Sequence, residues 1–149
     1  MTRDTRIGVV GGTGAVGSVT LGLLGAHGFE NVRVFASERS AGKRLDGGLV
    51  VEEATPDALS RGDVDVFLFS VGTGASRQLV PHAVEGGAIA IDKSSAYRLQ
   101  DGIPLVVPEV NGQRAVGHVV HLLATPASRH DHFASRPEDL QRHAHHAQA

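Results

Sequence analysis

The stretch VVGGTGAVG, residues 9–17, constrains the fold of this chain more than any other part of the sequence. Its first two valines end the run RIGVV, residues 6–10, and its loop places Gly12, Gly14 and Gly17 at GxGxxG spacing, immediately before a segment with helical period. Glycine permits a tight turn between a strand and a helix, and it lets an anionic group approach the N–H groups at the helix start. Because strand, loop and helix agree, the sequence favours a dinucleotide-binding β–α–β unit over a tight turn without a ligand.

Short β-branched runs alternate with longer amphipathic segments, a pattern typical of βαβ units that build a parallel sheet. The expected strands are residues 6–11, 31–36, 49–53, 64–70, 88–92 and 104–108. We therefore predict an α/β fold of the Rossmann type, which is a doubly wound, mostly parallel sheet with helices on both faces.

Two helices are expected between these strands. The first covers residues 15–27 before a C-cap at Gly28, and the residues expected to face the core are Val16, Val19, Leu23 and Leu24. The second covers residues 75–87 and ends at a pair of glycines, with Pro81 as a candidate kink; its inward residues are expected to be Leu79, Ala83 and Val84.

Composition limits the classes of function. With 149 residues, 41% of them hydrophobic, the chain is long enough for one core and too short for two domains of ordinary size. A formal net charge of -2 supplies no basic face, so a nucleic-acid partner is not expected. The N-terminus lacks the apolar run of a signal peptide or membrane span, so we expect a cytoplasmic protein with no membrane partner.

The sequence pattern changes after Asn111. Residues 1–111 are expected to form the dinucleotide-binding domain, and residues 112–149 a divergent, His-rich tail that is a candidate for disorder. The tail contains seven of the nine histidines, at spacings such as His118-x-x-His121 that could chelate a metal in part. No carboxylate or thiolate is placed to complete a coordination shell, so no metal site is assigned.

The segment after the second expected strand bears on which dinucleotide binds. Glu38 occupies the position at which an acidic residue holds the ribose 2′-hydroxyl of NAD. Its neighbours Ser37, Arg39 and Ser40, with Lys43 close by, supply a guanidinium and hydroxyl groups suited to a 2′-phosphate. The sequence favours NADP; the alternatives are NAD and a polar loop that only faces solvent.

Four stretches carry a family resemblance: GGTGAVG, FASERSAGKRL, FSVGTGAS and IDKSSAYRLQDGIPLVVPEVN. Their order and intervals are those of aspartate-β-semialdehyde dehydrogenases, so the chain resembles the N-terminal half of that family from about residue 5 to Asn111. The resemblance implies the NADP-binding, Rossmann-type domain of an oxidoreductase in amino-acid biosynthesis. That enzyme reduces β-aspartyl phosphate to the semialdehyde with release of phosphate.

The resemblance also implies roles for individual residues. The loop expected to hold the pyrophosphate consists of Gly11, Gly12, Thr13, Gly14, Ala15, Val16 and Gly17, and the residues expected to hold the 2′-phosphate are Ser37, Arg39 and Ser40. Ser70 and Gly72 would lie along the nucleotide. Arg98 corresponds to an arginine that binds the substrate phosphate or inorganic phosphate, a role suited to a planar guanidinium, and otherwise it is a surface arginine. Lys93 departs from the family pattern, which has asparagine there, and its charge could disturb the nicotinamide side of the site.

The family reaction requires a cysteine thiolate, and this chain contains no cysteine. The run LLATPAS, laid against the family's IIANPNC, places Ser128 in the cysteine position. A serine hydroxyl without a general base is a weak nucleophile, so no catalytic residue is assigned. The family's second domain, which supplies the remaining active-site groups, is also missing from the pattern.

We therefore expect an NADP-binding domain that is truncated and inactive alone. The alternatives are a non-catalytic NADP-binding or regulatory module and a gene remnant. A homo-oligomer or pairing with a full-length relative is compatible with the first two. A frameshift in the gene would account for the loss of family pattern after Asn111.

Overall fold

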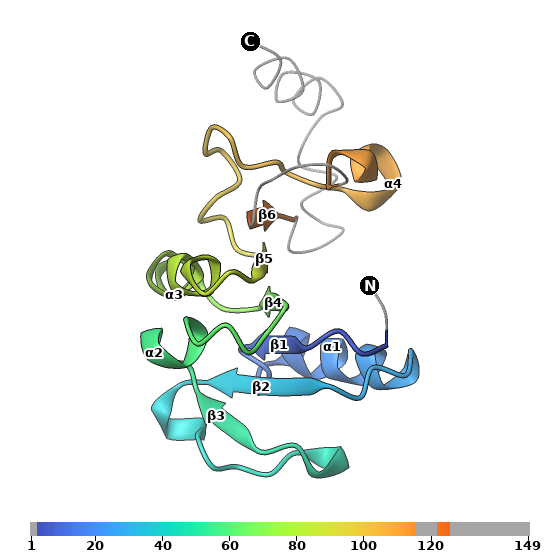
Figure 1. Ribbon diagram of the computed structural model, residues 1–149, viewed down its shortest axis with the longest axis vertical. Helices are drawn as coiled ribbons and strands as arrows, with labels where there is room; N and C mark the ends of the chain where they lie inside the picture. The colour runs from blue at the N-terminus through green and yellow to red at the C-terminus, as the bar shows by residue number, and fades with distance from the viewer. Residues whose placement is uncertain (1–2, 116–121, 126–149) are drawn as a thin grey trace.

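The computed structural model of the chain describes residues 3–115 and 122–125. Its centre is a six-stranded sheet in which every neighbouring pair of strands is parallel, with the order β3-β2-β1-β4-β5-β6 (Figure 1). The strands are β1 (Ile7–Val10), β2 (Val32–Ala36), β3 (Val51–Glu53), β4 (Val66–Phe69), β5 (Ile89–Asp92) and β6 (Leu122–Ala124). The first five lie within the expected strand ranges.

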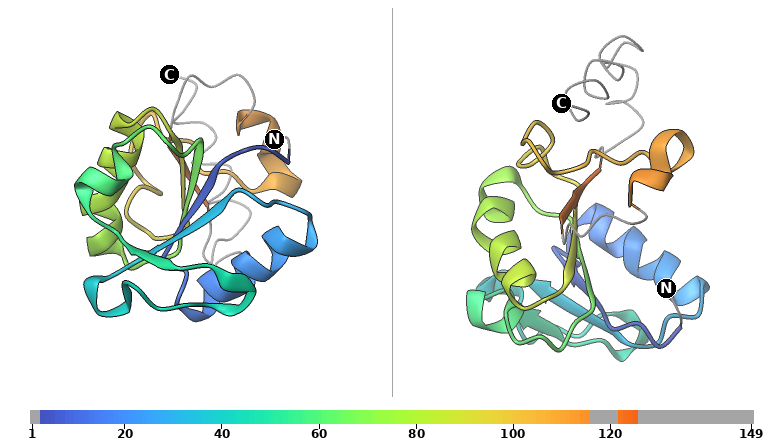
Figure 2. Two further views of the ribbon diagram at one scale, coloured as in Figure 1. Left: turned by 60° about the horizontal axis from the view of Figure 1, so that its bottom comes forward. Right: turned by 45° about the horizontal axis from the view of Figure 1, so that its top comes forward.

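Helices cover both faces of the sheet. The helix α1 (Ala15–Ala26) lies on one face, whereas α2 (Pro56–Leu59) and α3 (Thr73–Glu85) lie on the other, as the two views in Figure 2 show. A short helix α4 (Pro108–Asn111) follows β5. This strand order and the placement of the helices confirm the predicted Rossmann-type, doubly wound α/β fold.

The larger apolar cluster fills the space between the sheet and the α2–α3 face. The rings of Phe35 and Phe67 meet edge to face with their centroids 5.6 Å apart, and Val80 and Ala83 of α3 are fully buried against this layer. A smaller cluster on the other face joins Leu21 of α1 to buried residues of β2 and β3. Burial of strands on both faces explains why their sequences are continuously apolar.

The predicted inner face of α1 is wrong for three of its four residues. Val16, Val19 and Leu23 are 50%, 64% and 57% exposed, whereas Gly17 and Thr20 are buried. A Cβ atom at position 17 would collide with the backbone of Gly11 and Gly12, so only glycine allows this approach to the loop. We infer that this contact sets the rotation of the helix, which the apolar period alone did not reveal.

The buried face of α3 is rotated by about one residue relative to the predicted face. Ala83 is buried as expected, but the other buried residues are Ser76 and Val80, while Leu79 and Val84 are partly buried at the edge of the core. Pro81 lies on the exposed side, and the helix continues through it to Glu85.

The sixth strand does not lie at residues 104–108 as predicted. There Leu105 forms only an isolated bridge with Ala124, and Pro108 begins α4. Proline has no backbone N–H to donate to a sheet, so the prolines at both ends of this run oppose a regular strand. The strand that pairs with β5 is Leu122–Ala124, which lies in the segment assigned to the tail. The rest of that segment from residue 116, including Ser128 and all its histidines, lies outside the described residues.

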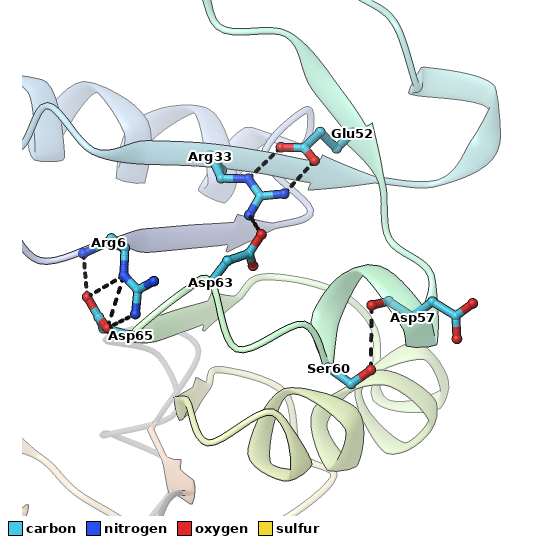
Figure 3. Close-up of polar contacts among 7 residues, drawn as sticks. All are labelled: Arg6, Arg33, Glu52, Asp57, Ser60, Asp63 and Asp65. Carbon is cyan, nitrogen blue, oxygen red and sulfur yellow. Dashed lines mark hydrogen bonds and ion pairs between the residues drawn. The ribbon is translucent and has the colours of Figure 1, made fainter.

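An ion-pair network fixes the edge strand β3 to the sheet (Figure 3). Arg33 of β2 donates two hydrogen bonds to Glu52 of β3, at 2.7 and 2.6 Å, and also contacts Asp63 at 2.7 Å. Nearby, Arg6 donates through its backbone and side chain to Asp65, ahead of β4. Arg6 and Arg33 lie at the amino-terminal ends of β1 and β2. These ion pairs therefore leave the carboxyl ends of the strands available for other groups.

Candidate functional site

The glycine loop turns sharply at the carboxyl end of β1. Gly11 has φ of 85°, and its N–H donates to the Phe35 carbonyl of β2 at 2.7 Å. A side chain at position 11 would be strained and would collide with the Ser70 carbonyl at the end of β4. The loop is therefore held between the ends of β2 and β4, the two strands that flank β1.

The start of α1 is arranged to receive an anion. Its N-cap residue is Gly14, which provides no side-chain oxygen, and no acidic residue occupies the first turn. The N–H groups of the first turn of a helix have no partners within the helix, and the helix dipole adds positive potential there. Gly17 brings this turn against the loop, so these donors face the carboxyl edge of the sheet.

A polar turn follows β2 at the same edge. Ser37 precedes a single 3₁₀ turn, Glu38–Ser40, and its carbonyl accepts from the Ser40 N–H at 2.8 Å. The side chains of Glu38 and Arg39 are both exposed. Since Val10 and Phe35 are paired in register, this turn and the glycine loop leave adjacent strands at the same level.

A cleft of about 380 Å³ opens on the other side of the glycine loop. It lies between the carboxyl ends of β4 and β5 and the first turns of α1 and α3. The residues that line it are Val16, Ser70, Val71, Gly72, Thr73, Lys93, Ser94, Ser95 and Arg98. The N-cap of α3 is Gly72, again without a side-chain cap or an acidic first turn, so a second helix start faces this cleft.

Hydroxyl groups supply the cleft with neutral polar contacts. The Oγ atom of Ser70 is buried and has no hydrogen-bond partner among the described residues. Across the cleft, the hydroxyls of Thr73 and Ser95 lie 2.9 Å apart. A buried hydroxyl without a partner is costly, so a ligand that bonds to Ser70 would remove that cost.

Asp92 holds the wall of the cleft in place from behind. Its carboxylate is fully buried and accepts from Ser76 Oγ at 2.8 Å, from the Ser94 N–H at 3.1 Å and from Ser94 Oγ at 2.6 Å. These bonds tie the end of β5 to α3 and shape the turn that carries the next residues. Burial also raises the pKa of the neighbouring Tyr97 hydroxyl, and the negative charge of Asp92 acts in the same direction.

Two cationic side chains line the cleft beyond this turn. Lys93 is half-buried, and its Nζ donates to Thr20 Oγ1 of α1 at 3.2 Å. Burial lowers the pKa of its ammonium group from the usual value. Arg98 is also partly buried and donates to the Lys93 carbonyl at 2.9 Å. The cleft therefore contains two cationic side chains, which suit anionic or electron-rich ligands.

The predicted site residues occupy two neighbouring places along one edge. Val16, Ser70, Gly72 and Arg98 line the cleft, whereas Ser37, Arg39 and Ser40 lie beyond the glycine loop and do not. Four other lining residues, Val71, Thr73, Ser94 and Ser95, were not predicted from the sequence. All four lie in the quoted motifs after expected strands, so the rule that ligands bind at the carboxyl ends of parallel strands would have found them.

Comparison with known proteins connects this geometry to a family. The family model described as semialdehyde dehydrogenase, NAD binding domain, matches residues 6–118. The chain belongs to this family. Aspartate-semialdehyde dehydrogenase of Bacillus subtilis is 43% identical over 116 residues, which cover 74% of this chain and 33% of the relative.

Solved structures agree with the sequence match. Aspartate semialdehyde dehydrogenase II of Vibrio cholerae, complexed with ASA, is 34% identical with a TM-score of 0.70 over 83% of this chain and 42% of that one. The enzyme of Candida albicans, solved with NADP, is 28% identical with a TM-score of 0.64 over 74% of this chain and 35% of that one. The chain thus contains an NAD(P)-binding domain of the aspartate-semialdehyde dehydrogenase type, an oxidoreductase family.

The chain matches only part of the length of its relative from Bacillus subtilis, of which it spans about a third, 33%.

Among residues 3–115 and 122–125, no helix is both long and apolar enough to cross a membrane.

Proposed function

We propose that this domain binds NADP in preference to NAD along the carboxyl edge of the sheet. The pyrophosphate would lie at the start of α1, the 2′-phosphate at Ser37, Arg39 and Ser40, and the nicotinamide half over β4 and β5. The observation that carries the proposal is the turn after β2: it presents an exposed guanidinium beside the glycine loop, at the level where β1 and β2 end. A guanidinium fork suits a phosphate better than a ribose hydroxyl.

Calorimetric titration of NADP and NAD tests this proposal. We expect Arg39→Ala to weaken NADP binding about tenfold, the magnitude of one lost charge-assisted contact, and to leave NAD binding unchanged. Arg61→Ala, which removes an exposed guanidinium from the loop before β4, is the matched control and should change neither affinity. Equal affinities for the two nucleotides, together with loss of NAD binding in Glu38→Gln, would instead identify an NAD site.

We also propose that the chain alone does not catalyse the phosphorylating dehydrogenation of the family. A thioester requires a thiol, and the sequence contains none. The test follows NADP reduction with aspartate semialdehyde and phosphate, comparing the native chain with Ser128→Ala. Turnover that disappears in the variant would make Ser128 catalytic and would contradict the proposal.

Arg98 is our candidate for binding the phosphate of the substrate or inorganic phosphate, because its guanidinium lines the cleft beside the start of α3. Pairing with a second copy or a longer relative, and the lack of a nucleic-acid partner, stay predictions.

A further inference from the structure

Lys93 connects the end of β5 to α1 across the cleft. Its backbone N–H continues the sheet by donating to the Phe69 carbonyl at 3.2 Å, while its side chain reaches Thr20 on the first turns of α1. The Thr20 hydroxyl uses its own proton to bond the Val16 carbonyl at 2.9 Å, so it meets the ammonium group with a lone pair. One of the three N–H donors of the Lys93 ammonium group is thus used, and this bond holds the group at the wall of the cleft.

The charge on Lys93 has no counter-ion among the described residues. The nearest carboxylate in sequence, Asp92, is fully buried and accepts hydrogen bonds from Ser76 and Ser94. Burial alone accounts for the lowered pKa of Lys93, with no contribution from a neighbouring charge. The second cation of the cleft, Arg98, contacts the Lys93 carbonyl and adds positive charge to the same wall.

The proposed function places the nicotinamide half of the dinucleotide in this cleft, and the present inference rests on that placement. With the adenosine half beside β2 and the pyrophosphate at α1, the other half must extend over β4 and β5, where the cleft opens. The oxidised nicotinamide ring carries one positive charge that the reduced ring lacks. Every other group of the two cofactor forms is the same.

We propose that Lys93 makes the cleft select the reduced nicotinamide dinucleotide over the oxidised one. The ammonium group repels the cationic ring and leaves the neutral ring unaffected, so it acts on the ratio of the two affinities. For two unit charges that share one cleft, at an effective dielectric constant between about 20 and 40, Coulomb repulsion corresponds to a preference of roughly five- to thirtyfold. Lys93 thereby sets the preference of the cleft for the reduced form of the cofactor over the oxidised form, a role distinct from recognition of the 2′-phosphate.

The test measures dissociation constants for NADPH and NADP by titration of the full chain. Lys93→Met removes the charge and keeps most of the length of the side chain, and Lys93→Gln serves as a second neutral variant that keeps a polar N–H group. We expect both to reduce the ratio of NADP to NADPH dissociation constants by about five- to thirtyfold. Lys93→Arg should retain the native ratio.

Lys43→Met is the matched control because Lys43 is the other lysine of the chain and directly follows the turn after β2, where its N–H donates to the Ser40 carbonyl. It should change the affinities for both cofactor forms together and leave their ratio as in the native chain. An unchanged ratio in a folded Lys93→Met or Lys93→Gln variant would overturn the inference while leaving the NADP site intact. Failure of the native chain to bind either cofactor form would overturn both proposals.

Discussion

The approach of Gly17 to the glycine loop predicts opposite effects of two glycine-to-alanine substitutions in the same helix. At position 17, a Cβ atom would collide with the Gly11 carbonyl and the Gly12 Cα, both of which are backbone atoms that cannot rotate away. At position 22, in the middle of α1, a Cβ atom would have no neighbour within 4 Å.

The magnitudes follow from two competing effects. Replacement of a helical glycine by alanine stabilises a helix by about 0.5–1 kcal/mol, and Gly22→Ala should show this gain in the free energy of unfolding. Gly17→Ala has the same backbone gain but adds overpacking, which typically costs about 1–3 kcal/mol. We therefore expect a net loss of roughly 0.5–2 kcal/mol, together with weaker nucleotide binding because the loop must shift.

Urea denaturation of the two variants and the native chain measures both effects. A Gly17→Ala protein at least as stable as Gly22→Ala would show that the loop yields without cost. It would also contradict the inference that the close approach of Gly17 to the glycine loop sets the rotation of α1.

Two further predictions concern charged groups. The hydrogen bonds from Arg6 lower the pKa of Asp65 from 3.8 to about 2, so the stability that this pair contributes is complete above about pH 5 and is lost as the pH falls through about 2. Unfolding curves over this range should show a weaker acid dependence for Asp65→Asn than for the native chain, and equal acid dependence of the two proteins would contradict this. The substitution Asp92→Ala removes the buried carboxylate and leaves the hydroxyls of Ser76 and Ser94 without their acceptor. We expect it to lower the free energy of unfolding by about 1–3 kcal/mol. A loss below about 0.5 kcal/mol, the size of a typical surface substitution, would contradict a stabilising role for these hydrogen bonds.

The fold was predictable because its signals are local. Each apolar run is short and bounded by turn residues, and GxGxxG between a strand and a helix leaves few alternatives to a Rossmann-type unit. The inner face of α1 was not predictable from period, because the helix carries apolar residues on both sides. What decides between them is a backbone contact of Gly17, a residue without any side chain to mark it.

The sixth strand and the cleft depend on contacts between distant residues, which could not be predicted from local sequence patterns. Residues 104–108 look like a strand, but the pairing partner of β5 is a three-residue segment that follows α4, and so short a strand has no period of its own. Sequence motifs singled out Ser70, Gly72 and Arg98, all of which line the cleft. The contact of Lys93 with Thr20, in contrast, joins residues 73 positions apart. No local pattern encodes that contact.

Backbone amide chemical shifts during titration with NADP would show whether a dinucleotide lies along the carboxyl edge of the sheet. We expect large shifts at residues 11–17, at 37–40, and at 70–73 and 93–98 around the cleft, with residues near Arg6, Arg33 and Asp63 unaffected. Shifts confined to those ion-pair residues, or no shifts at saturating NADP, would contradict it.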